Sequence, residues 1–261
     1  MTTTTVAFQA VARNLPQSLA RAAAVPQTAN ESEYYLKNIS QVETLDDLMA
    51  NDRLYRYVVK SFGLEDMAYA KAFIRKVLEG GVEDKNSFAN KLSDPRYREL
   101  AKVFDFENYG SATTSLQQTR QGTVDRYVRQ VFEEQQGNQN ENVRLALYFE
   151  RKASSLTNAY EILADPALLK VVQTALGIPS STSMMPIDKQ AAMITKRLDF
   201  DSLKSAESVK TFLLRFTSLA DVGTAQAAGS GALSILVGPP VAAGMSTDVL
   251  FSIQNLRLGG L

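Results

Sequence analysis

Ile162–Ile178 has the sequence ILADPALLKVVQTALGI, and this stretch decides the fold class that we predict. Asp165 stands where a helix would begin, and its side-chain oxygen can accept an otherwise free backbone N–H there. Pro166 follows at the first helical position, where the missing N–H costs nothing. Apolar residues then recur at helical spacing, and Gly177 supplies a stop. The stretch predicts a short helix, a cap and a second helix.

A second stretch, Leu48–Leu64, has the related sequence LMANDRLYRYVVKSFGL. Aligned without gaps, Asn51 takes the place of Asp165 as the cap, and Gly63 again closes the helix. A shorter copy of the cap and its proline stands at Asp94-Pro95. We therefore predict two internally repeated helical units.

Helical periodicity extends over most of the chain between Ala10 and Phe216. One series of apolar residues, from Leu145 to Leu163, predicts a long amphipathic helix that starts near Glu141. Strand signals are poor, because alternating Val, Ile and Thr runs are few and Asn-Gly or Asp-Gly turns are absent. The predicted fold class is all-α, multi-helical, with flexible termini.

This pattern divides the chain into five predicted segments. They are a flexible or partly helical N-terminal arm (1–27), helical unit 1 (28–110), a polar connecting helix and loop (111–142), helical unit 2 (143–217) and an Ala/Gly-rich C-terminal segment (218–261). The Gln- and Asn-rich run Gln135–Asn142 is the predicted exposed loop, with Gly122 and Gly137 as breaks. A short final helix is predicted from the Ser246 or Thr247 cap through Leu256.

Composition excludes most catalytic chemistry. The 261-residue chain has no Cys, no His and no Trp, and its 28 Lys and Arg residues balance 28 Asp and Glu residues. Without His and Cys there is no Ser–His or Cys–His catalysis, no His-ligated zinc and no disulfide, which leaves carboxylate, Lys, Tyr or Arg chemistry. A balanced charge gives no basic face for nucleic acid. We predict a non-enzyme with no catalytic, cofactor-binding or metal-binding residues, no cofactor and no nucleic-acid partner.

The ends of the chain carry no membrane signal. Met1–Val6 lacks the basic start and apolar core of a secretory signal. No charged residue lies between Asp221 and Asp248, but only Ala232–Val237 is continuously apolar there, and a spanning helix needs about 20 apolar residues. We predict a soluble protein without a membrane span. The uncharged tail is either a loosely packed terminus or a segment that orders against a partner.

Three groups of side chains are candidate sites. Asp46-Asp47 and Glu133-Glu134 are adjacent carboxylates, but neighbours on a helix point apart, which predicts solvated surface. Tyr34-Tyr35, with Tyr55 and Tyr57, lie near two arginines, a mixture that suggests base stacking.

The repeat argues instead for core packing of these tyrosines, because apolar residues occupy the matching positions of the second copy. Arg144–Lys152 is dense in charge and aromatic residues, for which a structural helix is the first interpretation and a partner-binding face the alternative.

Several longer runs carry a resemblance to a known family. These are Asp52–Tyr57, Phe62–Leu78, Ser87–Tyr97, Leu145–Lys152 and Ser252–Gly260. They resemble an alphaproteobacterial domain family of unknown function, family 1217, which is often encoded in flagellar gene clusters. The resemblance implies a helical protein of the flagellar setting, with a flagellar component as its protein partner and no catalytic residues to transfer. Its implied location is the cytoplasm, or the flagellum after export without a cleavable signal peptide.

Two classes of function follow from this setting, and a third stays open. The first is a non-catalytic, flagellum-associated structural or assembly protein. The alternatives are a cytosolic chaperone or regulator of flagellar export or assembly, and an enzyme that uses carboxylate, Lys or Tyr chemistry. A deep pocket with converging ionisable groups would favour the enzyme.

Removing residues 222–261 tests the predicted segment organisation. The helical units hold nearly all the periodic apolar residues, so we expect the shortened chain to keep its helical circular dichroism and its cooperative melting. Loss of the cooperative transition would show that the tail belongs to the core.

Overall fold

The computed structural model describes the chain from Thr3 to Val237, with side chains as far as Val222. Over this range the chain forms helices and no strand, so the all-α prediction is confirmed. The predicted helix at Ser246–Leu256 lies outside the described residues. The chain divides into two units, 1–221 and 222–261. The second unit begins four residues after residue 218, the predicted start of the tail.

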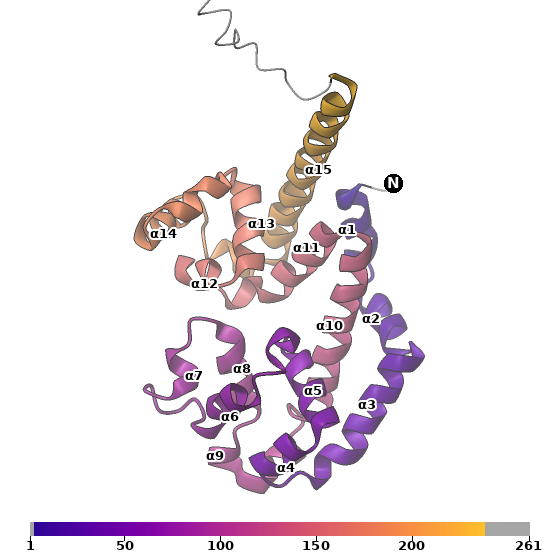
Figure 1. The fold of residues 1–261 in the computed structure, drawn as a ribbon, viewed down its shortest axis with the longest axis vertical. Helices are drawn as coiled ribbons and strands as arrows, with labels where there is room; N and C mark the ends of the chain where they lie inside the picture. Colours follow the sequence, from indigo (N-terminus) through magenta and orange to yellow (C-terminus); the bar gives the residue numbers. More distant parts are fainter. Residues whose placement is uncertain (1–2, 238–261) are drawn as a thin grey trace, which may run out of the picture. The chain divides into compact units, whose positions relative to one another are not determined.

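Short helices follow one another closely along the chain (Figure 1). In chain order they are α1 (Thr4–Ala12), α2 (Leu15–Ala23), α3 (Pro26–Asn38), η1 (Ile39–Gln41), α4 (Leu45–Ala50), α5 (Asp52–Ser61), η2 (Glu65–Met67), α6 (Lys71–Glu79), α7 (Phe88–Lys91), α8 (Pro95–Val103), α9 (Phe106–Tyr109), η3 (Gly110–Ser115), α10 (Gln121–Gln139), α11 (Glu141–Lys152), η4 (Ala153–Ser155), α12 (Ala159–Leu163), α13 (Pro166–Leu176), η5 (Ser180–Met184), α14 (Ile187–Thr195), η6 (Ser202–Lys204) and α15 (Ala206–Val237).

Helix α10 is the central element of the first unit. It packs against α2, α3 and α5, and it leads directly into α11, against which it also packs. Figure 1 shows α10 running between the N-terminal helices and α5. Helix α11 in turn contacts α1 and α13, so α10 and α11 join the early and late parts of the chain.

The predicted caps of the two longer stretches are present. The Asn51 Oδ1 atom accepts the N–H of Leu54 at 3.1 Å, and Asp165 Oδ1 accepts the N–H groups of Ala167 and Leu168 at 2.9 and 3.2 Å. Each bond satisfies a donor that the first helical turn leaves free.

The caps are themselves held by tyrosines on the preceding long helices. Asn51 Nδ2 donates to the hydroxyl of Tyr34 on α3 at 3.3 Å, and the Tyr148 hydroxyl on α11 donates to Asp165 Oδ2 at 2.6 Å. In both cases the tyrosine lies 17 residues before the cap. The helix start is therefore tied to a neighbouring helix.

The two capped helices also end alike. Gly63 and Gly177 have φ angles of 71° and 63°, a left-handed conformation that favours glycine. The next residue returns its N–H to a carbonyl five positions back, Leu64 to Val59 at 3.1 Å and Ile178 to Gln173 at 2.8 Å. This is the Schellman arrangement that closes a helix.

The shorter copy confirms its predicted cap as well, since Asp94 Oδ1 accepts the Arg96 N–H at 2.9 Å and Pro95 is the first residue of α8. These agreements between the stretches concern only the starts and ends of single helices. That the two longer stretches form a duplicated unit stays a prediction.

Two predicted boundaries were wrong. The apolar series from Leu145 to Leu163 does not form one helix, because α11 ends at Lys152 and α12 begins at Ala159. Asn158 accepts the N–H groups of Tyr160 and Glu161 at 3.0 and 3.2 Å, and so caps a new helix. The apolar spacing alone predicted one continuous helix, but the polar residue Asn158 starts a second one.

The expected loop at Gln135–Asn142 is also absent, because α10 continues to Gln139 and Asn140 alone separates it from α11. Gly137 does not break α10. A Cβ atom there would lie 2.6 Å from the Arg144 side chain, so the glycine allows α11 to approach closely.

Residues 3–27 are largely helical. It holds α1 and α2, and Phe8 and Ala22 are buried among the core residues. Asp221 on α15 accepts the N–H groups of Thr4 and Thr5 at 2.9 and 3.3 Å, which ties the start of α1 to the last helix.

Replacing Asp165 tests the capping arrangement. We expect Asp165→Ala to lower the free energy of unfolding by about 1 kcal/mol, because two N–H groups and the Tyr148 hydroxyl lose their acceptor. Thermal melting should fall by about 2–4 °C. Asp165→Asn, which keeps an accepting oxygen, should retain most of the stability, and the exposed Asp125→Ala serves as the control. Equal melting of Asp165→Ala and wild type would contradict the cap.

Candidate functional site

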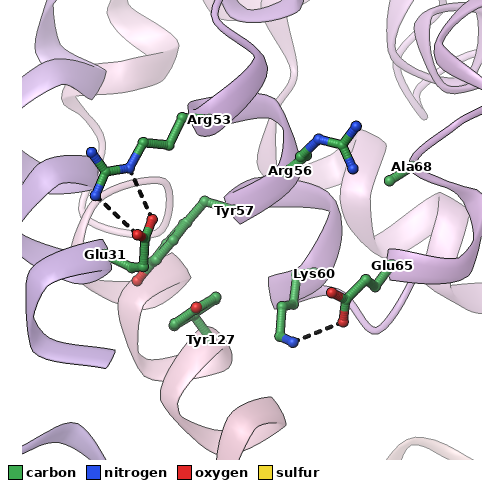
Figure 2. A pocket seen from close by; sticks show the side chains of 8 residues that line it. All are labelled: Glu31, Arg53, Arg56, Tyr57, Lys60, Glu65, Ala68 and Tyr127. Atoms are coloured by element: carbon green, nitrogen blue, oxygen red, sulfur yellow. Dashed lines mark hydrogen bonds and ion pairs between the residues drawn. The ribbon is translucent and has the colours of Figure 1, made fainter. Parts of the chain in front are cut away.

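A hollow of about 170 Å³ lies beside α5 and is shown in Figure 2. Arg53, Arg56 and Lys60 project from α5 at successive turns, and Tyr57 and Tyr127 line the hollow between them. Cationic side chains beside aromatic rings are the combination that binds single-stranded nucleic acid. Whether this hollow can bind such a ligand depends on the ion pairs that its three cations already form.

Each of the three cations already has a carboxylate partner. Arg53 forms a two-pronged pair with Glu31, at 3.0 and 2.9 Å, which Figure 2 shows as two dashed lines. Lys60 lies 2.8 Å from Glu65 and 2.9 Å from Glu134. Arg56 Nε pairs with Asp52 at 2.6 Å. The charges of this hollow are therefore satisfied within the chain.

The tyrosines beneath these charges form part of the core, as predicted. Tyr35, Tyr57 and Tyr127 stack in a row, with ring centroids 4.5 and 4.0 Å apart, and join α3, α5 and α10. All three are buried, and burial raises the pKa of Tyr57 well above its usual range. Tyr55 is buried too. The stack packs three helices together and presents no ring face for base stacking.

A second hollow, of about 300 Å³, separates α8 from α11, α12 and α13. We call it the α8–α13 groove, and its lining residues are Pro95, Arg98, Glu99, Lys102, Tyr148, Lys152, Ser155, Leu156, Glu161, Asp165 and Leu168. The α8 residues recur every three or four positions and so share one face of that helix. Leu156 and Leu168 form an apolar floor and are buried.

The acidic groups of the α8–α13 groove are all held by donors. Glu99 lies 2.7 Å from the Lys152 ammonium and 3.4 Å from Arg126. Burial opposes ionisation of Glu99, but these two cations outweigh it and hold its pKa below the usual range. Glu161 accepts the N–H and hydroxyl of Thr157 at 2.9 and 3.0 Å.

The third acidic group of the groove is the cap Asp165, and it receives the Tyr148 hydroxyl. Burial raises the pKa of Tyr148, and the adjacent carboxylate raises it further, so the phenol stays protonated as the donor. In contrast, Arg98 and Lys102 are exposed and form no ion pair with any residue that the structure describes. The groove thus has two cations without a partner.

A smaller enclosed hollow, of about 90 Å³, lies on the other side of the Tyr148–Asp165 pair. Its ionisable side chains converge, which is the feature that favours an enzyme. Each has a partner nonetheless: Arg96 pairs with Asp94 at 2.7 Å, and Arg144 pairs with Glu141 at 2.6 Å. The volume suits a few water molecules and no larger ligand.

Glu133 lies at the centre of a buried ion cluster, and the prediction of solvated surface for this residue was wrong. Its side chain is 2% exposed and accepts from Arg129 at 2.7 Å on α10 and from Arg151 at 2.8 Å on α11. Arg129 also donates to the Leu147 carbonyl at 3.0 Å and lies 3.6 Å from Glu150. Burial raises the pKa of the Glu150 carboxyl, and the nearby Arg129 opposes that rise.

The other predicted acidic neighbours diverge, as helix geometry requires. Glu134 turns away from Glu133 to Lys60. Asp46 pairs with Arg75, and Asp47 accepts the Thr44 hydroxyl at 2.8 Å in a capping box that lowers its pKa. Neither of the two predicted carboxylate pairs converges on one point.

Within the described part of the chain, no group of three or more acidic side chains is placed to hold a metal ion. None of the helices there combines the length and apolar character that a membrane crossing requires. The absence of catalytic residues stays a prediction. One sequence signal points to the α8–α13 groove, because Tyr148 and Lys152 belong to the segment Arg144–Lys152, for which a partner-binding face is the alternative prediction.

Comparisons with known proteins place these features in a family. The model of a family described as Protein of unknown function (DUF1217) matches residues 61–209. An X-ray crystal structure of a protein from Agrobacterium tumefaciens, a structural-genomics target, is 44% identical, with a TM-score of 0.76. The match covers 84% of this chain and 95% of that one. No curated protein matches the sequence.

Replacing Glu133 tests the buried ion cluster. We expect Glu133→Ala to lower the free energy of unfolding by about 3 kcal/mol, because it leaves two partly buried guanidinium groups without their carboxylate. The neighbouring Glu134→Ala is a matched control, since its half-exposed pair with Lys60 should contribute about 0–1 kcal/mol. Chemical denaturation measures both changes. Similar losses in the two variants would contradict the assigned role of Glu133.

Proposed function

The chain belongs to the DUF1217 family, and we propose that it is a non-catalytic structural or assembly protein of the flagellum that acts by binding another protein. The flagellar part of the proposal rests on the family resemblance, which implies a flagellar gene setting. The binding part rests on the surface and hollows of the molecule.

The observation that carries the proposal is the internal pairing of charge. Around the α5 hollow, the enclosed hollow and the buried cluster, the ionisable side chains are bonded to one another. A catalytic acid or base needs a free position facing a substrate and a pKa suited to its task. These pairs serve instead to hold helices together, which supports a structural role.

A second observation favours protein contacts. Met184 and Ile187, at the end of η5 and the start of α14, are 90% and 57% exposed. The chain there is held in place, because Gln190 Nε2 donates to the Met185 carbonyl at 2.7 Å. Exposed apolar side chains on a braced surface are typical of protein-binding sites.

Fractionation of motile cells tests the proposed function. The full-length chain, made from its own locus, should be recovered with purified flagella and basal bodies, and its deletion should reduce motility. Flagellin and a cytosolic enzyme serve as controls for the two fractions.

Recovery in the soluble fraction with a secreted flagellar protein would replace the proposal with the chaperone or regulator. Recovery in the soluble fraction without such a partner, together with normal motility of the deletion strain, would contradict a flagellar role altogether.

A further inference from the structure

We propose that Met184 is a modification site, where a peroxide oxidant converts the methionine thioether to its sulfoxide. The chain has no Cys and no Trp, so thioether sulfur is its most easily oxidised group. Met184 is the last residue of η5, and its side chain is 90% exposed. The reaction follows from sulfur chemistry and exposure alone, whereas its effect on a partner rests on the proposed protein-binding function.

Exposure distinguishes Met184 from the other methionines of the described residues. Met185 is 38% exposed, and Met49, Met67 and Met193 are partly buried and pack against the core. An oxidant must reach the sulfur atom before it can transfer oxygen, so susceptibility follows access to solvent. Met184 should therefore react first, Met185 second and the three partly buried methionines last.

Hydrogen peroxide alone balances the oxygen transfer. A lone pair of Met184 Sγ attacks one peroxide oxygen, so an S–O bond forms and the O–O bond breaks. The departing hydroxide takes the proton from the transferred oxygen and leaves as water. The sulfur is oxidised to the sulfoxide, and the peroxide is reduced.

The segment around Met184 is held in place by bonds that do not involve the Met184 side chain. Gln190 Nε2 donates to the carbonyls of Met185 at 2.7 Å and of Ser183 at 3.3 Å. The Met185 N–H donates to the Thr182 carbonyl at 2.9 Å. Because the Met184 side chain buries little surface, its oxidation removes little packing, and the fold should survive the reaction.

Oxidation of Met184 changes the character of the surface on which it lies. Met184, Met185 and Ile187 are exposed apolar side chains close together in the chain. A sulfoxide is polar where the thioether is apolar, so the modified surface is less apolar. Under the proposed function this change weakens a protein contact, and enzymes that reduce methionine sulfoxide would restore it.

Graded treatment of the full-length chain with hydrogen peroxide tests the proposal. Peptide mass spectrometry follows the gain of one oxygen atom at each methionine, and hydrophobic interaction chromatography follows the apolar character of the surface. The variant is Met184→Leu, which removes the sulfur and keeps an apolar side chain of similar size. Met193→Leu is the matched control on α14.

We expect Met184 to be oxidised severalfold faster than the three partly buried methionines. Treated wild type and treated Met193→Leu should elute earlier than the untreated proteins, and treated Met184→Leu should shift less. The melting temperature should stay unchanged until the partly buried methionines react. Met1 and Met245 lie outside the described side chains and are the same in all three proteins.

Oxidation of another described methionine before Met184 would overturn the proposal, and so would equal elution shifts in Met184→Leu and the wild type. A fall in melting temperature as Met184 reacts would also overturn it, because that side chain would then support the fold. None of these results bears on recovery of the chain with flagella, so the proposed function is tested separately.

Discussion

The start of each short helix is the constraint on which the rest of this structure depends. A chain of many short helices leaves free N–H groups at every helix start, and a buried N–H without an acceptor is costly. Here side chains such as Asn51 and Asp165 accept those donors. Because Tyr34 and Tyr148 bind these two caps, α5 and α13 are each fixed against a longer helix as well as satisfied at their own starts.

Packing and charge build on these fixed starts. The tyrosine stack joins α3, α5 and α10, and Phe149 stacks on Phe212 at 5.2 Å to join α11 to α15. Glu133 with its two arginines links α10 to α11. Such buried pairs contribute more to the fixed arrangement of helices than to net stability, since removal from water offsets much of their attraction. Most polar groups of the described interior therefore hold helices together, while the hydroxyl of Tyr55 and one carboxylate oxygen of Glu150 are buried there without a hydrogen bond.

The sequence predicted the local elements better than their arrangement. Asp165, Pro166 and Gly177 have fixed positions in a helix start and stop, so the limits of α13 followed directly from residue types. Periodicity alone failed between α11 and α12, because Leu156 and Tyr160 continue the apolar series although Asn158 caps a new helix. The amide-rich composition of Gln135–Asn142 predicts a loop, because composition does not show that α11 packs against α10, where Gly137 lies against Arg144.

The candidate site was less predictable because its residues come from distant parts of the chain. That Glu133 is buried depends on Arg151, a residue on another helix, and no local pattern gives that contact. The α8–α13 groove likewise joins residues from Pro95 to Leu168, which only the tertiary fold brings together. The core position of Tyr55 and Tyr57 was predictable, because the apolar Leu169 and Val171 occupy the matching positions of the second stretch.

The most direct test of the capping account is amide hydrogen exchange of the native protein, followed residue by residue by NMR. The account predicts that the N–H groups of Leu54 and Leu168, which the caps accept, exchange as slowly as N–H groups in the middle of α5 and α13. Exchange of these two amides at the rate of an unstructured chain, with the helix middles still protected, would contradict it.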